Sequence, residues 1–140
     1  MDSIRQLGAD AVVDRHQKDL EQQIQKILPG GEVDVVADVV GGTGFSMCFN
    51  LLCRGGRYVT SGAIAGPVVE LDLRTLYLKD LEMHGATVMP AGIFENLVGY
   101  IENGEISPLV AREFSIRDIK KAQEVFLAKR HIGKFVVLPG

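Results

Sequence analysis

The sequence lacks several features that would mark particular classes of protein. Its 140 residues include no tryptophan, two cysteines and five prolines, and 15 basic against 18 acidic residues give a formal net charge of −3. Because no basic stripe stands out, we expect no nucleic-acid partner. No apolar run approaches the roughly 20 residues of a membrane span, so we expect no membrane association. The N-terminus has no apolar signal segment, and we expect a cytoplasmic protein.

The few cysteines also argue against a metal centre. Cys48 and Cys53 do not form a Cys-x-x-Cys pair, and no histidine lies near them in the sequence. A zinc cluster needs such spacing, so we expect no metal site. Both residues fall in one apolar segment of a protein expected in a reducing compartment, and we interpret them as buried core thiols rather than a disulfide.

Alternating apolar patterns organise the chain, of which 46% is hydrophobic. No repeat or linker divides it, so we expect one domain over residues 1–140. Strands are expected at 11–14, 33–40, 57–61, 81–88 and 134–138, and helices at 17–28, 45–53, 73–79, 93–101 and from Ser115 onward. The valine-rich run 33–40 is typical of a strand covered on both faces. Regular alternation of this kind predicts an α/β fold with a largely parallel sheet flanked by helices.

The glycine-rich segment 41–44 follows the valine-rich strand and precedes a helix. That arrangement is a possible anion site, because the first N–H groups of a helix lack partners. However, Met47 replaces the third glycine of the dinucleotide fingerprint, and positions 58–69 contain no acidic residue to bind a ribose. We therefore favour a tight turn in which glycine supplies positive φ, with Asp38 capping it.

A second stretch of small residues, 61–66, follows the strand at 57–61. It either lets a flat ligand approach the backbone or is a simple loop, and the residues alone do not decide between the two. The histidines His16, His84 and His131 lie far apart, and no nucleophile–base pair is evident. We accordingly predict no catalytic residue.

Six segments in order carry a resemblance to a known family. They are LGADAVVD (7–14), GGEVDVVADVVGG (30–42), LLCRGGRYVTSGAIAGP (51–67), LYLKDLEMHGA (76–86), FSIRDIKKAQEVF (114–126) and GKFVVL (133–138). This set resembles the C-terminal part of the medium-chain dehydrogenases/reductases, and most of all the zinc-free, quinone-oxidoreductase-like branch of the zinc-binding alcohol dehydrogenase superfamily. The resemblance implies a partial Rossmann-like, NAD(P)-binding domain and hydride transfer to quinones, enones or alcohol/carbonyl substrates.

The resemblance also assigns roles to two loops. It implies that Val40, Gly41 and Gly42 lie near the nicotinamide ribose. It further implies that Ser61, Gly62, Ala63 and Ile64 line the nicotinamide. Family members have a catalytic domain, a first Rossmann strand and a glycine-rich phosphate loop before this region. We therefore expect a single truncated NAD(P)-binding domain that retains the family's C-terminal helix and strand.

Two hypotheses for function follow from the lack of the family's catalytic domain and phosphate loop in this sequence. The chain is either the cofactor-domain part of an NAD(P)H-dependent oxidoreductase, inactive on its own, or a non-catalytic dimerising or small-molecule-binding module. In both cases we expect NADP or NAD to bind weakly or not at all, and no zinc. The missing N-terminal half is a possible partner as a separate chain.

The resemblance further implies the order of the strands. The loss of two strands would leave the strand at 33–40 with an open edge flanked by Val33, Val35, Val36 and Val39. Either the strand at 11–14 moves beside it, or a second chain supplies a strand. The outer edge strand 82–88 is expected to pair with its copy across a two-fold axis and form a homodimer.

Overall fold

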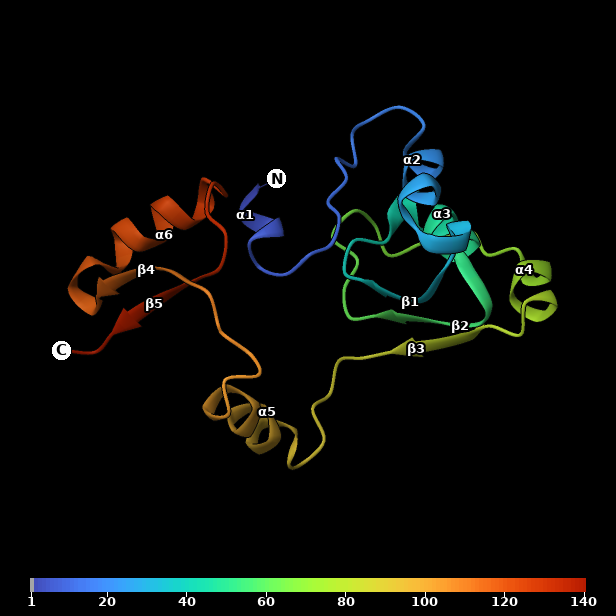
Figure 1. Cartoon of the computed structure of the whole chain (residues 1–140). Coiled ribbons are helices and arrows are strands. Elements are labelled where there is room, and N and C mark those ends of the chain that lie inside the picture. Colours follow the sequence, from blue (N-terminus) through green and yellow to red (C-terminus); the bar gives the residue numbers. More distant parts are fainter. Residues whose placement is uncertain (1) are drawn as a thin grey trace. The chain divides into compact units, whose positions relative to one another are not determined.

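The computed structural model describes residues 2–140 and the side chains of residues 4–140 (Figure 1). The chain divides after Val88 into two compact units, and Met89–Gly140 form the second. Together they have the α/β composition with parallel strands that the sequence predicts. That both units belong to one domain stays a prediction. No helix among the described residues has the length and apolarity to cross a bilayer.

Unit 1 contains a three-stranded parallel sheet in the order β1-β2-β3. Its elements are α1 (Asp2–Arg5), α2 (Leu20–Ile27), β1 (Val33–Asp38), α3 (Phe45–Asn50), β2 (Leu52–Thr60), α4 (Leu73–Leu78) and β3 (Glu82–Gly85). Figure 1 shows α2 and α3 on the same side of the sheet. The carboxyl ends of the strands point toward the same edge, which is where sites form in parallel sheets.

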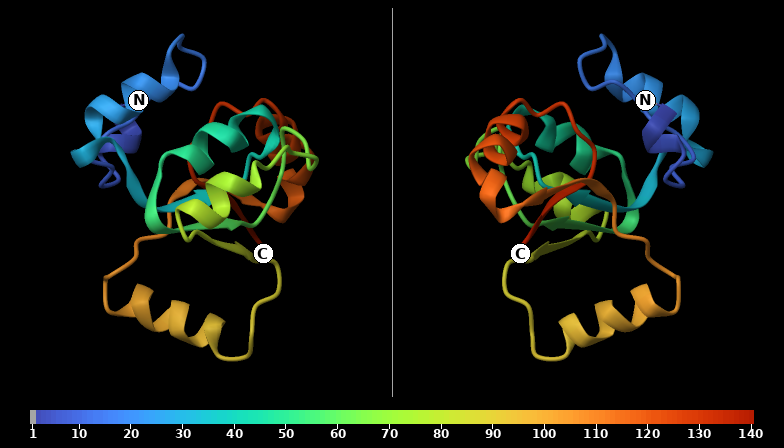
Figure 2. Two further views of the ribbon diagram at one scale, coloured as in Figure 1. Left: turned by 90° about the vertical axis from the view of Figure 1, so that its right-hand side faces the viewer. Right: turned by 90° about the vertical axis from the view of Figure 1, so that its left-hand side faces the viewer.

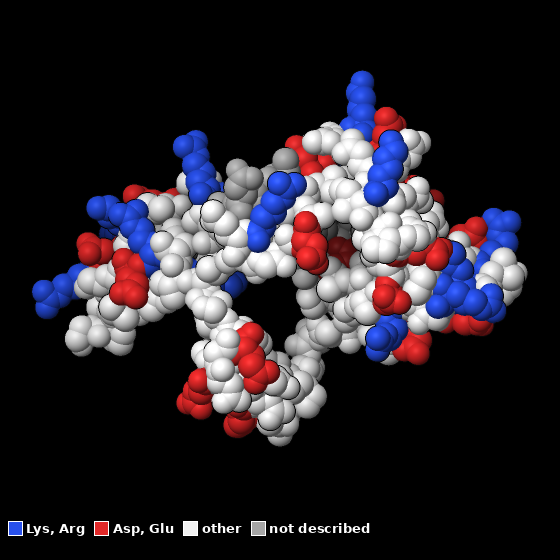
Figure 3. Space-filling view, in the orientation of Figure 1, with Lys and Arg blue, Asp and Glu red and all other residues white. Residues whose placement is uncertain are grey.

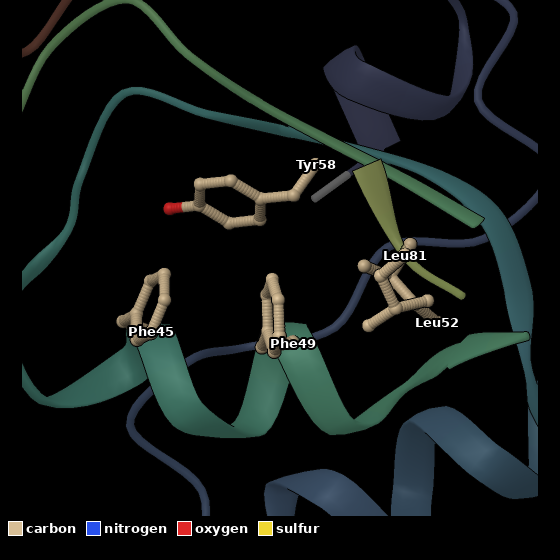
Figure 4. Close-up of a cluster of buried hydrophobic side chains, with 5 residues drawn as sticks. All are labelled: Phe45, Phe49, Leu52, Tyr58 and Leu81. Carbon is tan, nitrogen blue, oxygen red and sulfur yellow. The ribbon is translucent and has the colours of Figure 1, made fainter. Parts of the chain in front are cut away.

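An aromatic cluster fills the space between α3 and the sheet. Phe45 and Phe49 lie one turn apart on α3 and therefore share a face. Both rings contact Tyr58 of β2 at centroid distances of 5.2 and 5.9 Å (Figure 4). Leu52 and Leu81 complete the cluster, and Leu52 is fully buried. This core anchors the two strands whose ends carry the predicted site.

The helix predicted at 45–53 ends earlier than expected. It stops at Asn50, and Leu52 and Cys53 already belong to β2. The register between β1 and β2 shifts at this point, and Gly55 has φ +73°. Lys79 also donates to the carbonyls of Asn50 and Leu52 at 2.9 and 2.7 Å. The glycine bend and these two bonds explain why the strand begins before residue 57.

The N-terminal side of the sheet differs from the sequence prediction. Residues 11–14 form no strand, so the predicted strand there is wrong. A short apolar segment needs a neighbouring strand to pair with, and β1 lies at the edge of the sheet with no further strand from the described residues beside it. The predicted open edge of β1 is thus confirmed. Val35 is 49% and Val39 53% exposed, so the expectation of burial on both faces is wrong.

Unit 2 contains a two-stranded parallel sheet and two helices. Its elements are α5 (Ile93–Glu102), β4 (Val110–Ser115), α6 (Ile119–Leu127) and β5 (Lys134–Leu138). Both views in Figure 2 show α5 joined to the remainder of this unit by an extended segment. The strand at 134–138 is confirmed, and β4 was not predicted. The hydroxyl of Ser115 accepts from the N–H of Arg117 at the start of a 3₁₀ turn, Ile116–Asp118, that precedes α6.

Candidate functional site

Two loops follow β1 and β2 and are joined by backbone hydrogen bonds. The N–H of Ser61 donates to the carbonyl of Asp38 at 3.2 Å, and that of Ala65 to the carbonyl of Val40 at 2.8 Å. In the opposite direction, Gly42 donates to Gly66 at 3.0 Å. These bonds extend the pairing of β1 and β2 beyond the strand ends. Segments 39–42 and 61–66 therefore form one structural feature at the carboxyl edge of the sheet, which we call the loop pair.

Glycine is required where the two loops touch. Gly41 and Gly42 have φ values of +63° and +62°, in the region that glycine adopts without strain. A Cβ at Gly41 would lie 2.8 Å from the carbonyl oxygen of Gly66, and one at Gly42 would lie 2.8 Å from that of Ala65. The predicted tight turn is confirmed, and its glycines also allow the close approach of the second loop.

Asp38 caps the glycine turn from the end of β1. Its Oδ1 accepts from the N–H groups of Val40 at 2.7 Å and Gly41 at 3.1 Å, and its Oδ2 accepts from the hydroxyl of Tyr58 at 2.6 Å. The sequence prediction of a capping Asp38 is confirmed. Burial alone would raise the pKa of Asp38, but these hydrogen bonds outweigh it and hold the pKa below its usual range. The carboxylate is therefore charged at neutral pH.

A pocket of about 380 Å³ opens beside the glycine turn. Val40, Gly41 and Thr43 line one part of it, and Met47 and Cys48 of α3 line another. Arg15 brings a positive charge to the same pocket. Burial and the negative charge of Asp38 raise the pKa of the Cys48 thiol, so it is uncharged at neutral pH. The pocket thus offers backbone, apolar and cationic surfaces beside the loop pair.

The structure brings the predicted cofactor-binding residues together. Val40, Gly41 and Gly42 lie on the first loop, and Ser61–Ile64 lie on the second. The second group is exposed, with Ile64 81% accessible. Sequence reasoning missed Arg15 and Met47 as pocket residues. No local signal could have found them, since they reach the pocket through packing of distant segments.

The cysteines and histidines show no catalytic grouping. Cys48 and Cys53 are half-buried, so their predicted full burial in the core is wrong. Cys53 donates to Asp34 at 3.4 Å, at the opposite end of β2 from the loop pair. His84 lies 3.0 Å from Glu82. Among the side chains of residues 4–140, no three metal-ligating groups gather at one point. The expected absence of zinc stays a prediction.

Comparison with known proteins agrees with the geometry. Residues 7–137 match the model of a family described as zinc-binding dehydrogenase, and the chain belongs to that family. Its solved relatives include a protein described as an alcohol dehydrogenase from Sinorhizobium meliloti 1021, with 46% identity and a TM-score of 0.88 over 99% of this chain and 38% of that one. The resemblance seen in the sequence is thereby confirmed.

The names of two curated relatives describe a reductase and a quinone oxidoreductase-like protein. Acryloyl-coenzyme A reductase of Sulfurisphaera tokodaii is 29% identical over 78% of this chain and 33% of its own length. Quinone oxidoreductase-like protein 2 of Bos taurus is 24% identical over 94% of this chain and 40% of its own length. Solved structures that share the fold include complexes with NADP. The chain spans about 30–40% of these relatives' length and corresponds to their C-terminal part.

Proposed function

We propose that the chain is the cofactor-domain part of an NAD(P)H-dependent oxidoreductase and that the loop pair holds the nicotinamide side of the cofactor. The observation that carries this proposal is the joining of the two loops at the carboxyl ends of adjacent parallel strands. The chain corresponds to the C-terminal part of family members whose names describe them as dehydrogenases or reductases, and the loop pair lies in that part.

The second loop has donors suited to an amide ligand. Gly62 and Ala63 are exposed, and within the described chain no acceptor pairs with their N–H groups. They can donate to the carboxamide oxygen of a nicotinamide ring that lies against the loop. Once bound, that ring would supply or accept the hydride. The carboxylate and phenol at the loops, Asp38 and Tyr58, are buried and bonded to each other, so we propose that they serve structure and that this chain does not turn over quinones or enones by itself.

Binding of the cofactor is proposed to be weak. The sequence has no Gly-x-Gly-x-x-Gly segment, and pyrophosphate held at a helix N-terminus supplies much of the affinity for a dinucleotide. Contacts limited to the loop pair and the adjacent pocket correspond to a dissociation constant of about 1 mM, or about −4 kcal/mol. NADP and NAD are both compatible with these contacts.

The two cysteines make a direct test of the site possible. Cys48 lines the pocket beside the loop pair, whereas Cys53 lies at the other end of β2 and serves as an internal control. We expect millimolar NADPH to slow alkylation of Cys48, measured by mass spectrometry, without changing that of Cys53. Calorimetric titration should give a millimolar constant. A Cys48 alkylation rate that saturating NADPH leaves unchanged would contradict the site, and a micromolar constant would contradict weak binding.

The alternative function is a non-catalytic dimerising or small-molecule-binding module. The observation that favours dimerisation is the outer edge of β3, which is exposed and carries no further strand from the described chain. We propose that β3 pairs with its copy in antiparallel fashion. The outer edge of β1 likewise has no further strand from the described chain beside it. A separate chain that carries the N-terminal half would be expected to bind at that edge.

A further inference from the structure

Tyr58 combines a core position with a polar contact at the site. Its side chain is 2% exposed and its ring contacts Phe45 and Phe49. In Figure 4 its hydroxyl points past Phe45, away from Leu52 and Leu81. A phenylalanine would fill the same volume without the cost of removing a hydroxyl from water. The hydroxyl is retained with a partner, Asp38, at 2.6 Å.

The hydrogen bonds of Asp38 are divided between its two oxygens. Oδ1 accepts from Val40 and Gly41, and Oδ2 accepts from Tyr58 and, at 3.2 Å, again from Gly41. Tyr58 thereby holds the carboxylate plane in the rotation at which Asp38 accepts from the N–H groups of Val40 and Gly41. Burial and the neighbouring carboxylate raise the pKa of Tyr58, which keeps its proton available to donate.

We propose that Tyr58 is a positioning residue of the loop pair, acting through Asp38. The phenol orients the carboxylate, the carboxylate holds Val40 and Gly41, and Val40 in turn accepts from Ala65 of the second loop. The aromatic core thus sets the geometry of both loops through one side chain. The inference rests on the proposed function only for the identity of the ligand that the loops hold.

Hydrogen exchange can separate this role from core packing. In Tyr58→Phe we expect exchange of the Gly41 and Ala65 amides to rise about 10-fold, the effect of losing one hydrogen bond. The amides of Val36 and Val59, which alternation along the strands directs into the pairing of β1 with β2, should change less. As a matched control, Phe49→Leu weakens the same cluster without touching Asp38, so it should raise exchange at all four amides alike. The same uniform pattern in Tyr58→Phe would overturn the proposal.

A double-mutant cycle tests whether Tyr58 acts through Asp38. In an Asp38→Ala background, where the acceptor oxygens are absent, adding Tyr58→Phe should change the exchange of Gly41 and Ala65 by less than about 2-fold. An equal effect of Tyr58→Phe in both backgrounds would overturn the proposal. If Tyr58→Phe fails to fold, Asp38→Ala alone tests the cap, because its loss should expose the same two amides selectively.

The ligand arm is measured separately. If NADPH protects Cys48 in the parent chain, the NADPH concentration that halves the alkylation rate of Cys48 should rise about 3- to 10-fold in Tyr58→Phe. In the folded fraction of Phe49→Leu, the same concentration should be unchanged. If NADPH protects Cys48 in neither, the proposed function fails while the exchange data still decide the role of Tyr58. Protection that is equal in parent and Tyr58→Phe would contradict the positioning role.

Discussion

The two units differ in how they bury apolar side chains. In unit 1, five residues form a buried cluster between α3 and the sheet, and the loop pair extends directly from the strands that carry it. In unit 2, only Phe114 and Ala122 are buried among the described residues, and α5 buries none of its side chains. Phe94 on α5 is 62% exposed. The candidate site therefore lies on unit 1, the unit whose strands are anchored by a buried aromatic cluster.

Charge separates the units as well. Unit 1 has 8 basic and 12 acidic residues, whereas unit 2 has 7 and 6. Within unit 2, all basic residues follow position 111, so α5 and its flanking segments are acidic and apolar. On the face shown in Figure 3, the α5 region carries red but no blue atoms. Unit 2 is therefore divided into an α5 part and a more basic part formed by β4, α6 and β5.

A core substitution in each unit gives the largest expected contrast. Leu52→Ala removes a fully buried side chain of unit 1 and should cost about 2–5 kcal/mol of unfolding free energy. Leu97→Ala, on α5 and 39% exposed, should cost less than about 1 kcal/mol. Urea denaturation followed by circular dichroism measures both. Equal costs would show that the two units do not differ in burial as described.

Glycine substitutions give the next contrast. Gly41→Ala adds backbone strain at φ +63° and a Cβ only 2.8 Å from the carbonyl of Gly66, so we expect a loss of about 2–3 kcal/mol. Gly104→Ala is the matched control in unit 2, because it has φ +74° and open space around its Cβ position. It should lose about 1 kcal/mol from strain alone. Thermal denaturation of both variants gives the difference, and equal losses would mean that the contact between the loops costs nothing.

The sequence predicted the elements whose apolar pattern is dense. The strands predicted at 33–40 and 134–138 are found as Val33–Asp38 and Lys134–Leu138, because dense runs of valine and other apolar residues indicate strands. Residues 11–14 have the same composition but no neighbour to pair with. Residues 110–115 read VAREFS, which has no period-2 alternation, so the sequence predicts no strand there, although pairing with β5 makes them one. Pairing partners are a tertiary property that local patterns do not contain.

The site shows the same limit at the level of single residues. Asp38 and the glycine turn are adjacent in sequence, so the cap could be predicted from residue type and position. Tyr58 reaches Asp38 from a neighbouring strand, and Arg15 reaches the pocket from a segment that precedes α2. Nothing near either residue in the sequence indicates those contacts. The cofactor roles of Ser61–Ile64 came from the family resemblance and stay predictions.

The cap at Asp38 predicts a dependence of unit 1 stability on pH. Its folded pKa is lowered by hydrogen bonds to Tyr58, Val40 and Gly41, so its contribution is present above the unfolded pKa of about 3.9 and is lost as pH falls through the folded pKa. The free energy of unfolding of the parent minus that of Asp38→Asn should therefore shrink as pH decreases from 6 toward acid. A difference that is constant with pH would exclude a charged cap.

The smallest expected effect concerns the exposed edge of unit 1. Because the N–H of Ala86 donates to Thr60 on the inner side, alternation along β3 directs the N–H of Met83 outward, where a partner strand would accept it. Met83→Pro removes that donor and should weaken a dimer formed through β3 by about 1–2 kcal/mol, or roughly 5- to 30-fold in its dissociation constant. His84→Ala is the matched control, since it deletes the contact with Glu82 but keeps every backbone donor. Light scattering after size exclusion, over a range of protein concentrations, compares the three proteins. A parent chain that stays monomeric throughout, or a dimer equally stable in Met83→Pro and His84→Ala, would exclude pairing through this edge.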